Sequence, residues 1–189
     1  MRHSPRPLAF ALLAISLCFN GAAGARAADG SETPGDVIKN IGDVFIYIVP
    51  SAAFGMTLGA KDGAGARQFA KSAVVSMGTV AAFKYTVKSR RPNGDPQSFP
   101  SGHTAICVQS AEFMRRRYGW KYGLPAYAIA GFVGYSRATT GEHYSRDVFA
   151  GALMAFLGTH WIAKPYAGGK LEFRTDRRAT PSLVYVREF

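Results

Sequence analysis

The chain has 189 residues and a formal charge of +11, so it is long enough for one domain with a substantial core. The positive charge suggests a polyanionic partner, cations that flank membrane segments, or a solvated basic surface. No zinc-finger spacing, aromatic-interleaved basic strand or basic heptad helix occurs, so nucleic acid is not the expected partner. The sequence also has no metal-ligand spacing of Cys and His and no Walker-type glycine loop. We therefore expect a mechanism without a metal ion or other cofactor.

Residues 1–27 have the pattern of a secretory signal peptide. Arg2 and Arg6 form a basic start, Leu8–Phe19 is a short apolar run, and Ala25-Arg26-Ala27 fits a small-x-small cleavage site. Cleavage before Ala28 would lower the formal charge from +11 to +8. The alternative is an uncleaved first membrane helix, but the apolar run is shorter than the roughly 20 residues that span a bilayer.

The rest of the chain divides into a linker, a helical region and a C-terminal extension. Residues 28–39 are a polar linker, and residues 168–189 contain Leu171–Arg174 and Leu183–Arg187, which predict a β-hairpin or two strand-like extensions. Between them, largely uncharged runs predict helices over residues 44–60, 68–88, 101–119, 124–135 and 148–163. The sequence therefore predicts an all-α fold, an antiparallel bundle of five to six helices over residues 40–167.

Basic residues gather at one set of predicted helix ends, and the candidate catalytic residues lie at the other. The basic set is Lys61, Arg67, Lys71, Arg115, Arg116, Arg117, Lys121 and Lys164. This distribution fits the positive-inside rule for a membrane protein whose site faces outward. A soluble periplasmic bundle would have the same helix order, and the mean hydropathy of −0.01 favours it. The charge distribution favours association with the inner membrane, with the active site facing the periplasm.

The first candidate cluster is Lys84 and Arg91, which lie seven residues apart near the end of a predicted helix. This spacing is about two helical turns, so both side chains point to one face before Pro92 ends the helix. An ammonium and a guanidinium aimed at one point suit the oxygens of a tetrahedral oxyanion. Taken alone, the pair is better explained by cationic capping of a helix C-terminus.

The second cluster, Pro100-Ser101-Gly102-His103, lies at the start of a helix. Ser101 suits the N-cap position, and Gly102 lets the backbone approach a ligand closely. The free N–H groups of a helix N-terminus attract anions, and a histidine can protonate a leaving oxygen. The alternative is an ordinary N-cap followed by a surface histidine.

The third cluster contains Ser136, Arg137, His143 and Asp147. The spacing of His143 and Asp147 predicts that both lie on one face of a helix, where the carboxylate hydrogen-bonds the imidazole. That bond would select one tautomer and leave the other nitrogen as a nucleophile or base. A surface hydrogen bond is the alternative, and Arg146 is a possible competitor for Asp147.

Taken together, the clusters resemble the three-part motif of the type 2 phosphatidic acid phosphatase superfamily. The matching residues are Lys84-x6-Arg91-Pro92, then Pro100-Ser101-Gly102-His103, then Ser136-Arg137-x5-His143-x3-Asp147. The spacing agrees at every position of the motif, which covers about a third of the chain. The superfamily also contains bacterial non-specific acid phosphatases and vanadium-dependent haloperoxidases, and its fold is an α-helical bundle.

The resemblance implies a role for each matched residue. His143 is the nucleophile that forms a phosphohistidine, Asp147 orients it, and His103 protonates the leaving alcohol and later activates water. Phosphate-binding residues are Lys84, Arg91, Ser101, Gly102 and Arg137, and no metal is required. The expected substrate is a phosphorylated lipid or a small phosphate ester.

Three other functions remain open from the sequence. One is a soluble periplasmic non-specific acid phosphatase, which would have the same motif. A vanadate-dependent haloperoxidase is disfavoured because the chain is short and has no additional aromatic-rich domain. A non-catalytic phospholipid-binding module is disfavoured because binding alone needs neither His103 nor His143.

Overall fold

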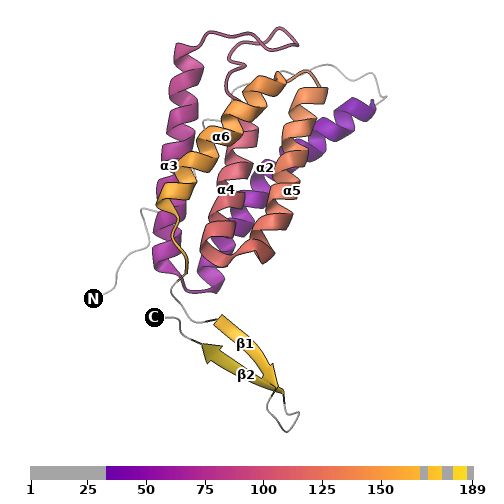
Figure 1. Ribbon diagram of the computed structural model, residues 1–189. Helices are drawn as coiled ribbons and strands as arrows, with labels where there is room; N and C mark the ends of the chain where they lie inside the picture. The colour runs from indigo at the N-terminus through magenta and orange to yellow at the C-terminus, as the bar shows by residue number, and fades with distance from the viewer. Residues whose placement is uncertain (1–32, 167–169, 176–180, 187–189) are drawn as a thin grey trace, which may run out of the picture. The chain divides into compact units, whose positions relative to one another are not determined.

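The computed structural model describes residues 33–166, 170–175 and 181–186, so the expected signal peptide lies outside the described residues. Five helices run side by side within residues 33–166 (Figure 1). They are α2 (Pro34–Gly59), α3 (Gly63–Thr86), α4 (Gly102–Tyr118), α5 (Trp120–Thr139) and α6 (Ser145–Ile162). The predicted all-α bundle is confirmed.

Helix α4 lies at the centre of the bundle and contacts each of the other four helices. Residues 104–114 are all buried, including the polar side chains of Gln109, Ser110 and Glu112. Cys107 is a free, fully buried thiol, as expected for a small core residue. Because α4 is enclosed by its neighbours, its N-terminus at Gly102 is held in one place relative to the ends of α3, α5 and α6.

Helix α2 begins earlier than the sequence predicted, and this corrects the linker boundary. Thr33 caps the helix in a reciprocal capping box with Asp36, and Pro34 occupies the first turn, so residues 34–39 are helical rather than linker. Pro50 lies inside the helix without ending it. At 26 residues, α2 is the one helix of the described chain that is long and apolar enough to cross a membrane.

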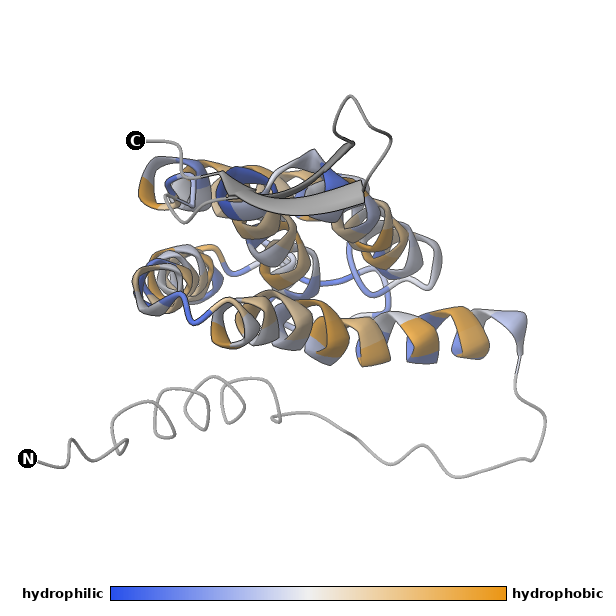
Figure 2. Cartoon of the chain, turned by 90° about the horizontal axis from the view of Figure 1, so that it is seen from below, coloured by the Kyte–Doolittle hydropathy of each residue, from blue (hydrophilic) through white to orange (hydrophobic). Residues whose placement is uncertain are grey.

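Large apolar side chains are exposed on several helices. Hydrophobic residues, coloured orange, recur along the helices in Figure 2. On α6 they recur every four residues, at Phe149, Leu153, Leu157 and Trp161. Further exposed apolar residues on α2 and α3 include Val37, Ile41, Val44, Ile48, Val74 and Val75. Apolar surface that continues over several helices is uncommon on soluble monomers and indicates contact with a membrane or another protein.

The C-terminal extension contains two strands, β1 (Lys170–Thr175) and β2 (Pro181–Val186). They pair antiparallel, with Lys170 opposite Val186 and Thr175 opposite Pro181. The predicted β-hairpin is therefore confirmed.

Candidate active site

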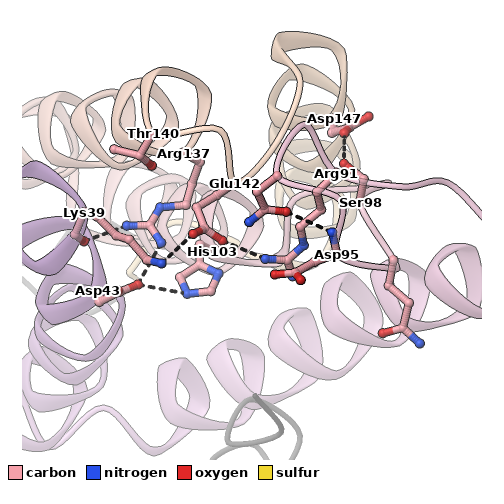
Figure 3. A network of polar contacts seen from close by, with 12 residues as sticks. Lys39, Asp43, Arg91, Asp95, Ser98, His103, Arg137, Thr140, Glu142 and Asp147 are labelled. Carbon is pink, nitrogen blue, oxygen red and sulfur yellow. Dashed lines mark hydrogen bonds and ion pairs between the residues drawn. The ribbon is translucent and has the colours of Figure 1, made fainter. Parts of the chain in front are cut away.

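The three predicted clusters meet at one end of the bundle, where four segments converge (Figure 3). These segments are the first half of α2, the loop 87–101, the N-terminus of α4 and the turn 140–144. Backbone hydrogen bonds join them: Asn93 N donates to Gly141 O at 3.2 Å, and Ser101 N donates to Asp147 O at 2.9 Å. The loop between α3 and α4 is thus held against the start of α6.

Ser101 caps helix α4, as its sequence position predicted. Its hydroxyl lies 3.0 Å from the Thr104 hydroxyl and accepts a long hydrogen bond of 3.5 Å from Thr104 N. Gly151 on α6 faces this cap so closely that a Cβ there would collide with the Ser101 carbonyl. The glycine therefore allows α6 to pack directly on the N-terminus of α4, whose N–H groups are a suitable place for an anion.

Arg137 and His103 share one carboxylate that the sequence analysis missed. Asp43 Oδ1 accepts from Arg137 Nη1 at 2.8 Å and lies 3.3 Å from His103 Nε2 (Figure 3). Arg137 Nη2 also donates to the Lys39 carbonyl at 2.7 Å, so the buried guanidinium is held by α2. Gly42 permits this contact, since a Cβ at that position would lie 2.7 Å from Arg137 Nη2.

Arg91 is paired with a second carboxylate outside the predicted set. Glu142 Oε2 accepts from Arg91 Nη1 at 2.8 Å, and Glu142 Oε1 lies 2.5 Å from Lys39 Nζ. The side chain of Glu142 therefore bridges two cations directly beside His143 in the chain. Burial opposes ionisation of Glu142, but Lys39 and then Arg91 hold its pKa below the usual value. Glu142 is therefore a buried anion within a cationic site.

Lys84 and Ser98 complete this end of the bundle. Lys84 Nζ donates to the Gln97 carbonyl at 2.7 Å, so the ammonium lies against the loop that carries the second cluster. Helix α3 ends at Thr86 and Arg91 lies in the following loop, so the prediction that Lys84 and Arg91 share one helical face is wrong. Ser98 is fully buried, and its hydroxyl donates a short hydrogen bond to Asp147 Oδ2. Ser98 is a further site residue that the sequence analysis missed.

His143 and Asp147 do not share a helical face, which corrects the sequence prediction. Helix α6 begins at Ser145 with Tyr144 as its N-cap, so His143 lies in the preceding turn. Asp147 is in the first turn of α6, where Oδ2 accepts from Tyr144 N at 3.2 Å. The Asp147 carboxylate accepts from the backbone N–H of the N-cap residue Tyr144, and this capping bond takes the place of the predicted hydrogen bond to His143.

Three buried polar atoms of the predicted site have no hydrogen-bond partner among the described residues: Arg91 Nε, His143 Nδ1 and Asp147 Oδ1. Such atoms are uncommon in folded proteins, because burying an unpaired polar group costs about 1–3 kcal/mol. Their concentration here distinguishes this end of the bundle from an ordinary capped helix terminus.

Burial and neighbouring cations keep His143 neutral. His143 is only 2% exposed. Burial away from water is the largest cause that lowers the pKa of its imidazole from 6.5 to about 3. The positive charges of Arg91 and Lys84 act in the same direction. An imidazole that remains unprotonated near neutral pH has a lone pair available for attack on an electrophile.

Three charged residues of the site, Lys39, Asp43 and Glu142, were not predicted. The uncharged run that predicts the first helix starts at Val44, so Lys39 and Asp43 fell before the predicted helix. Their four-residue spacing was a usable signal. Glu142 offered a weaker one, an acidic residue directly before the expected nucleophile.

Comparisons with known proteins agree with this arrangement. The family model described as "PAP2 superfamily" matches residues 65–167. A lipid A 1-phosphatase of Porphyromonas gingivalis is 37% identical over 84 residues, 42% of this chain and 19% of the relative. A lipid A 4'-phosphatase of Helicobacter pylori is 28% identical over 132 residues, 64% of this chain and 66% of the relative. The chain thus spans less than two thirds of either curated relative.

A solved structure shows the same fold. The transmembrane PAP2-type phosphatidylglycerolphosphate phosphatase from Bacillus subtilis superposes with a TM-score of 0.50 and 22% identity, over 69% of this chain and 76% of that one. The family match covers more than half of the chain and includes all three motif clusters. The chain belongs to the PAP2 superfamily, the type 2 phosphatidic acid phosphatases.

Proposed function

We propose that this protein is a phosphatase that hydrolyses phosphate monoesters of lipids through a phosphohistidine at His143. The observation that carries the proposal is the meeting of the motif clusters at one end of the bundle, where buried polar atoms of Arg91 and His143 have no hydrogen-bond partner among the described residues. Burial and the charges of Arg91 and Lys84, which lower the pKa of His143, agree with it. The names of the two curated relatives, both lipid A phosphatases, support a phosphorylated lipid as the substrate class.

The cations of the site suit a phosphoryl group. An arginine side chain has five N–H donors. Within the described residues, Arg91 uses one of them and Arg137 uses three. The remaining donors, together with Lys84 and the N-terminus of α4 at Gly102, can hold the equatorial oxygens. They stabilise the negative charge of the transition state, a role that a metal ion has in other phosphatases.

The reaction follows from the positions of the two histidines. A ring nitrogen of His143 attacks phosphorus, and the bond between phosphorus and the alcohol oxygen breaks as His103 gives that oxygen a proton. His103 then takes a proton from water, which attacks the phosphohistidine and releases inorganic phosphate. Asp43 holds His103 in place at 3.3 Å. Asp147 is the carboxylate that we assign to orient His143; its Oδ1 lies 3.6 Å from Arg146 Nε, the competitor expected from the sequence.

The proposed location is the inner membrane, with the site at the periplasmic side. The exposed apolar faces of α2, α3 and α6 suit lipid, and Trp120 and Trp161 lie exposed toward the end that also carries Lys61, Arg67 and Lys121. By the positive-inside rule this basic end faces the cytoplasm, which leaves His103 and His143 on the periplasmic side.

The test is phosphate release by the purified chain from a lipid phosphomonoester in mixed micelles and from p-nitrophenyl phosphate. We expect release from both, and an acid-labile phosphoprotein when radiolabelled substrate is quenched in alkali. His143→Ala abolishes both signals, with a loss of about 10⁵-fold in turnover. His160→Ala, a histidine at the opposite end of the bundle, retains the phosphoprotein. Hydrolysis of p-nitrophenyl phosphate without hydrolysis of any lipid would contradict the lipid assignment, and an active His143→Ala would contradict the nucleophile.

A further inference from the structure

A groove of about 470 Å³ runs between α5 and α6, with α4 as its floor. No Asp, Glu, Lys, Arg or His lines it. The lining residues are Thr104 and Val108 from α4, Tyr127, Ala130, Gly131, Gly134 and Tyr135 from α5, and Ser145, Val148, Phe149, Ala152, Leu153 and Phe156 from α6. Apolar and small side chains dominate this set, which suits a hydrocarbon ligand.

We propose that this groove binds one hydrocarbon chain of the substrate while its phosphate occupies the site at His143. This inference rests on the proposed function, because it adds the chain to a phosphate site already assigned. In this proposal, α5 and α6 bind the hydrocarbon chain in addition to contributing Arg137 and Asp147 to the site.

One end of the groove lies next to the active site. Thr104 follows His103, and its hydroxyl lies 3.0 Å from that of Ser101. On the other helices, Tyr135 directly precedes Ser136 and Arg137, and Ser145 lies two residues after His143. A ligand in the groove therefore has one end beside the phosphate-binding residues.

The length of the groove matches one leaflet of a bilayer. From Tyr135 to Tyr127 the α5 wall rises about 12 Å, and from Ser145 to Phe156 the α6 wall rises about 17 Å, at 1.5 Å per residue. Half of a hydrocarbon core of roughly 30 Å is about 15 Å. A chain in the groove would lie parallel to its neighbours in the leaflet that faces the site.

Charge and polarity along the groove favour an amphipathic ligand with an anionic head. Arg91, Arg137 and Lys84 lie at the active-site end, and the walls between are uncharged. At the far end, Tyr127 donates its hydroxyl to the buried Glu112 at 2.5 Å, so a charged cluster lies beyond the apolar walls. Phosphate and hydrocarbon thus each meet a surface of matching chemistry.

Gly131 is the position for a direct test. A Cβ at Gly131 would have no heavy atom within 4 Å, so Gly131→Leu fills the groove without a backbone collision. Gly55→Leu is the matched control, because Gly55 is a helical glycine of α2 with equally open surroundings and no part in the groove. Ala152→Leu narrows the same groove from α6 and guards against a variant that fails to fold.

The measurement compares dipalmitoyl phosphatidate in mixed micelles with p-nitrophenyl phosphate. We expect Gly131→Leu and Ala152→Leu to raise KM for the long-chain lipid about tenfold and to leave p-nitrophenyl phosphate hydrolysis unchanged, since burial of about two methylenes is lost. Gly55→Leu should match the wild type on both substrates. Equal effects on both substrates, no effect on either, or a changed oligomeric state with equal effects would overturn the groove assignment.

Binding separates failure of the groove from failure of the proposed function. Radiolabelled dipalmitoyl phosphatidate is titrated onto His143→Ala protein with and without Gly131→Leu. A loss of about tenfold in affinity on adding Gly131→Leu supports the groove even if the wild type proves inactive, and unchanged affinity overturns it. Absence of wild-type hydrolysis on both substrates contradicts the phosphatase proposal alone.

Discussion

The two ends of the helical bundle differ in how completely their buried polar groups are paired. Away from the active site, Asp62 accepts from Arg117 through two nitrogens, at 2.7 and 2.6 Å, and also from Tyr118 and Gly65 N. Glu112 is likewise surrounded by Arg115, Tyr127 and His160. At the active-site end Asp43 and Glu142 are also paired with cations. Within the described residues, however, His143 Nδ1 and Arg91 Nε have no hydrogen-bond partner, and Asp147 Oδ1 has only the Arg146 guanidinium, at 3.6 Å.

Fully paired groups hold the bundle together, whereas unpaired donors remain able to bind a ligand. A carboxylate with every lone pair engaged can be buried at little net cost and pins the segments that it joins. A site with unpaired donors and excess cations is less stable by itself, but it gains most when an anion binds. The same residue types thus serve opposite purposes at the two ends.

The largest expected effect is at the end away from the active site. Asp62→Asn leaves the buried Arg117 guanidinium without its counter-charge, so we expect the free energy of unfolding to fall by about 3 kcal/mol. Denaturant unfolding in detergent measures this change. Asp95→Asn, at an exposed position, is the control and should be neutral. If Asp62→Asn kept normal stability but had a low turnover number, the assignment of a structural role to Asp62 would be wrong.

Asp43→Asn should slow hydrolysis of alkyl phosphates about 30-fold, because His103 loses the carboxylate that positions it for protonation of the leaving oxygen. p-Nitrophenyl phosphate has a good leaving group, which needs little protonation, so its hydrolysis should fall by less than about threefold. Steady-state kinetics on both ester types make the comparison.

Asp95→Asn, at an exposed position, is the control for Asp43→Asn and should leave both rates unchanged. An equal loss of activity on alkyl and p-nitrophenyl esters would show that Asp43 acts through Arg137, its other partner, rather than through His103.

Glu142→Gln should strengthen inhibition by inorganic phosphate about tenfold. The described site contains four cations, Lys39, Lys84, Arg91 and Arg137, and three carboxylates, Asp43, Glu142 and Asp147. Removing one negative charge beside Arg91 leaves a stronger field for the dianion. The inhibition constant measures the effect, with Asp95→Asn as a control. A weakened or unchanged constant would indicate that Glu142 serves only to join α2 to the turn 140–144.

The last comparison is a pH dependence of stability. The pKa of His143 is about 3 in the folded protein, below its usual value of 6.5, so the unfolded chain takes up a proton first as the pH falls. This residue therefore destabilises the fold progressively from about pH 6.5 toward pH 3. The midpoint of thermal unfolding should fall more for the wild type than for His143→Gln between pH 7 and 5. Parallel decreases would contradict a buried, neutral histidine.

The sequence predicted the helical fold and the meeting of the motif clusters because both depend on local patterns. Uncharged runs mark helices, and Ser101 occupied its expected N-cap position. The partners of the cations could not be found in this way. Asp43 reaches Arg137 across 94 residues, and Arg91 reaches Glu142 across 51, and such pairs depend on how helices pack. The start of α6 also depended on a local competition, since Asp147 could cap Tyr144 or orient His143.

Helix α2 limits how far the chain could be shortened while the site keeps its contacts. The family match begins at residue 65, after α2 has ended, and every motif residue lies inside that match. Yet Arg137 binds the Lys39 carbonyl and shares Asp43 with His103. A fragment that starts at residue 65 would therefore keep the whole motif while losing the α2 contacts of His103, the proposed acid, and of Arg137, a proposed phosphate-binding residue. Any shorter unit meant to keep this arrangement must include the helix that carries no motif residue.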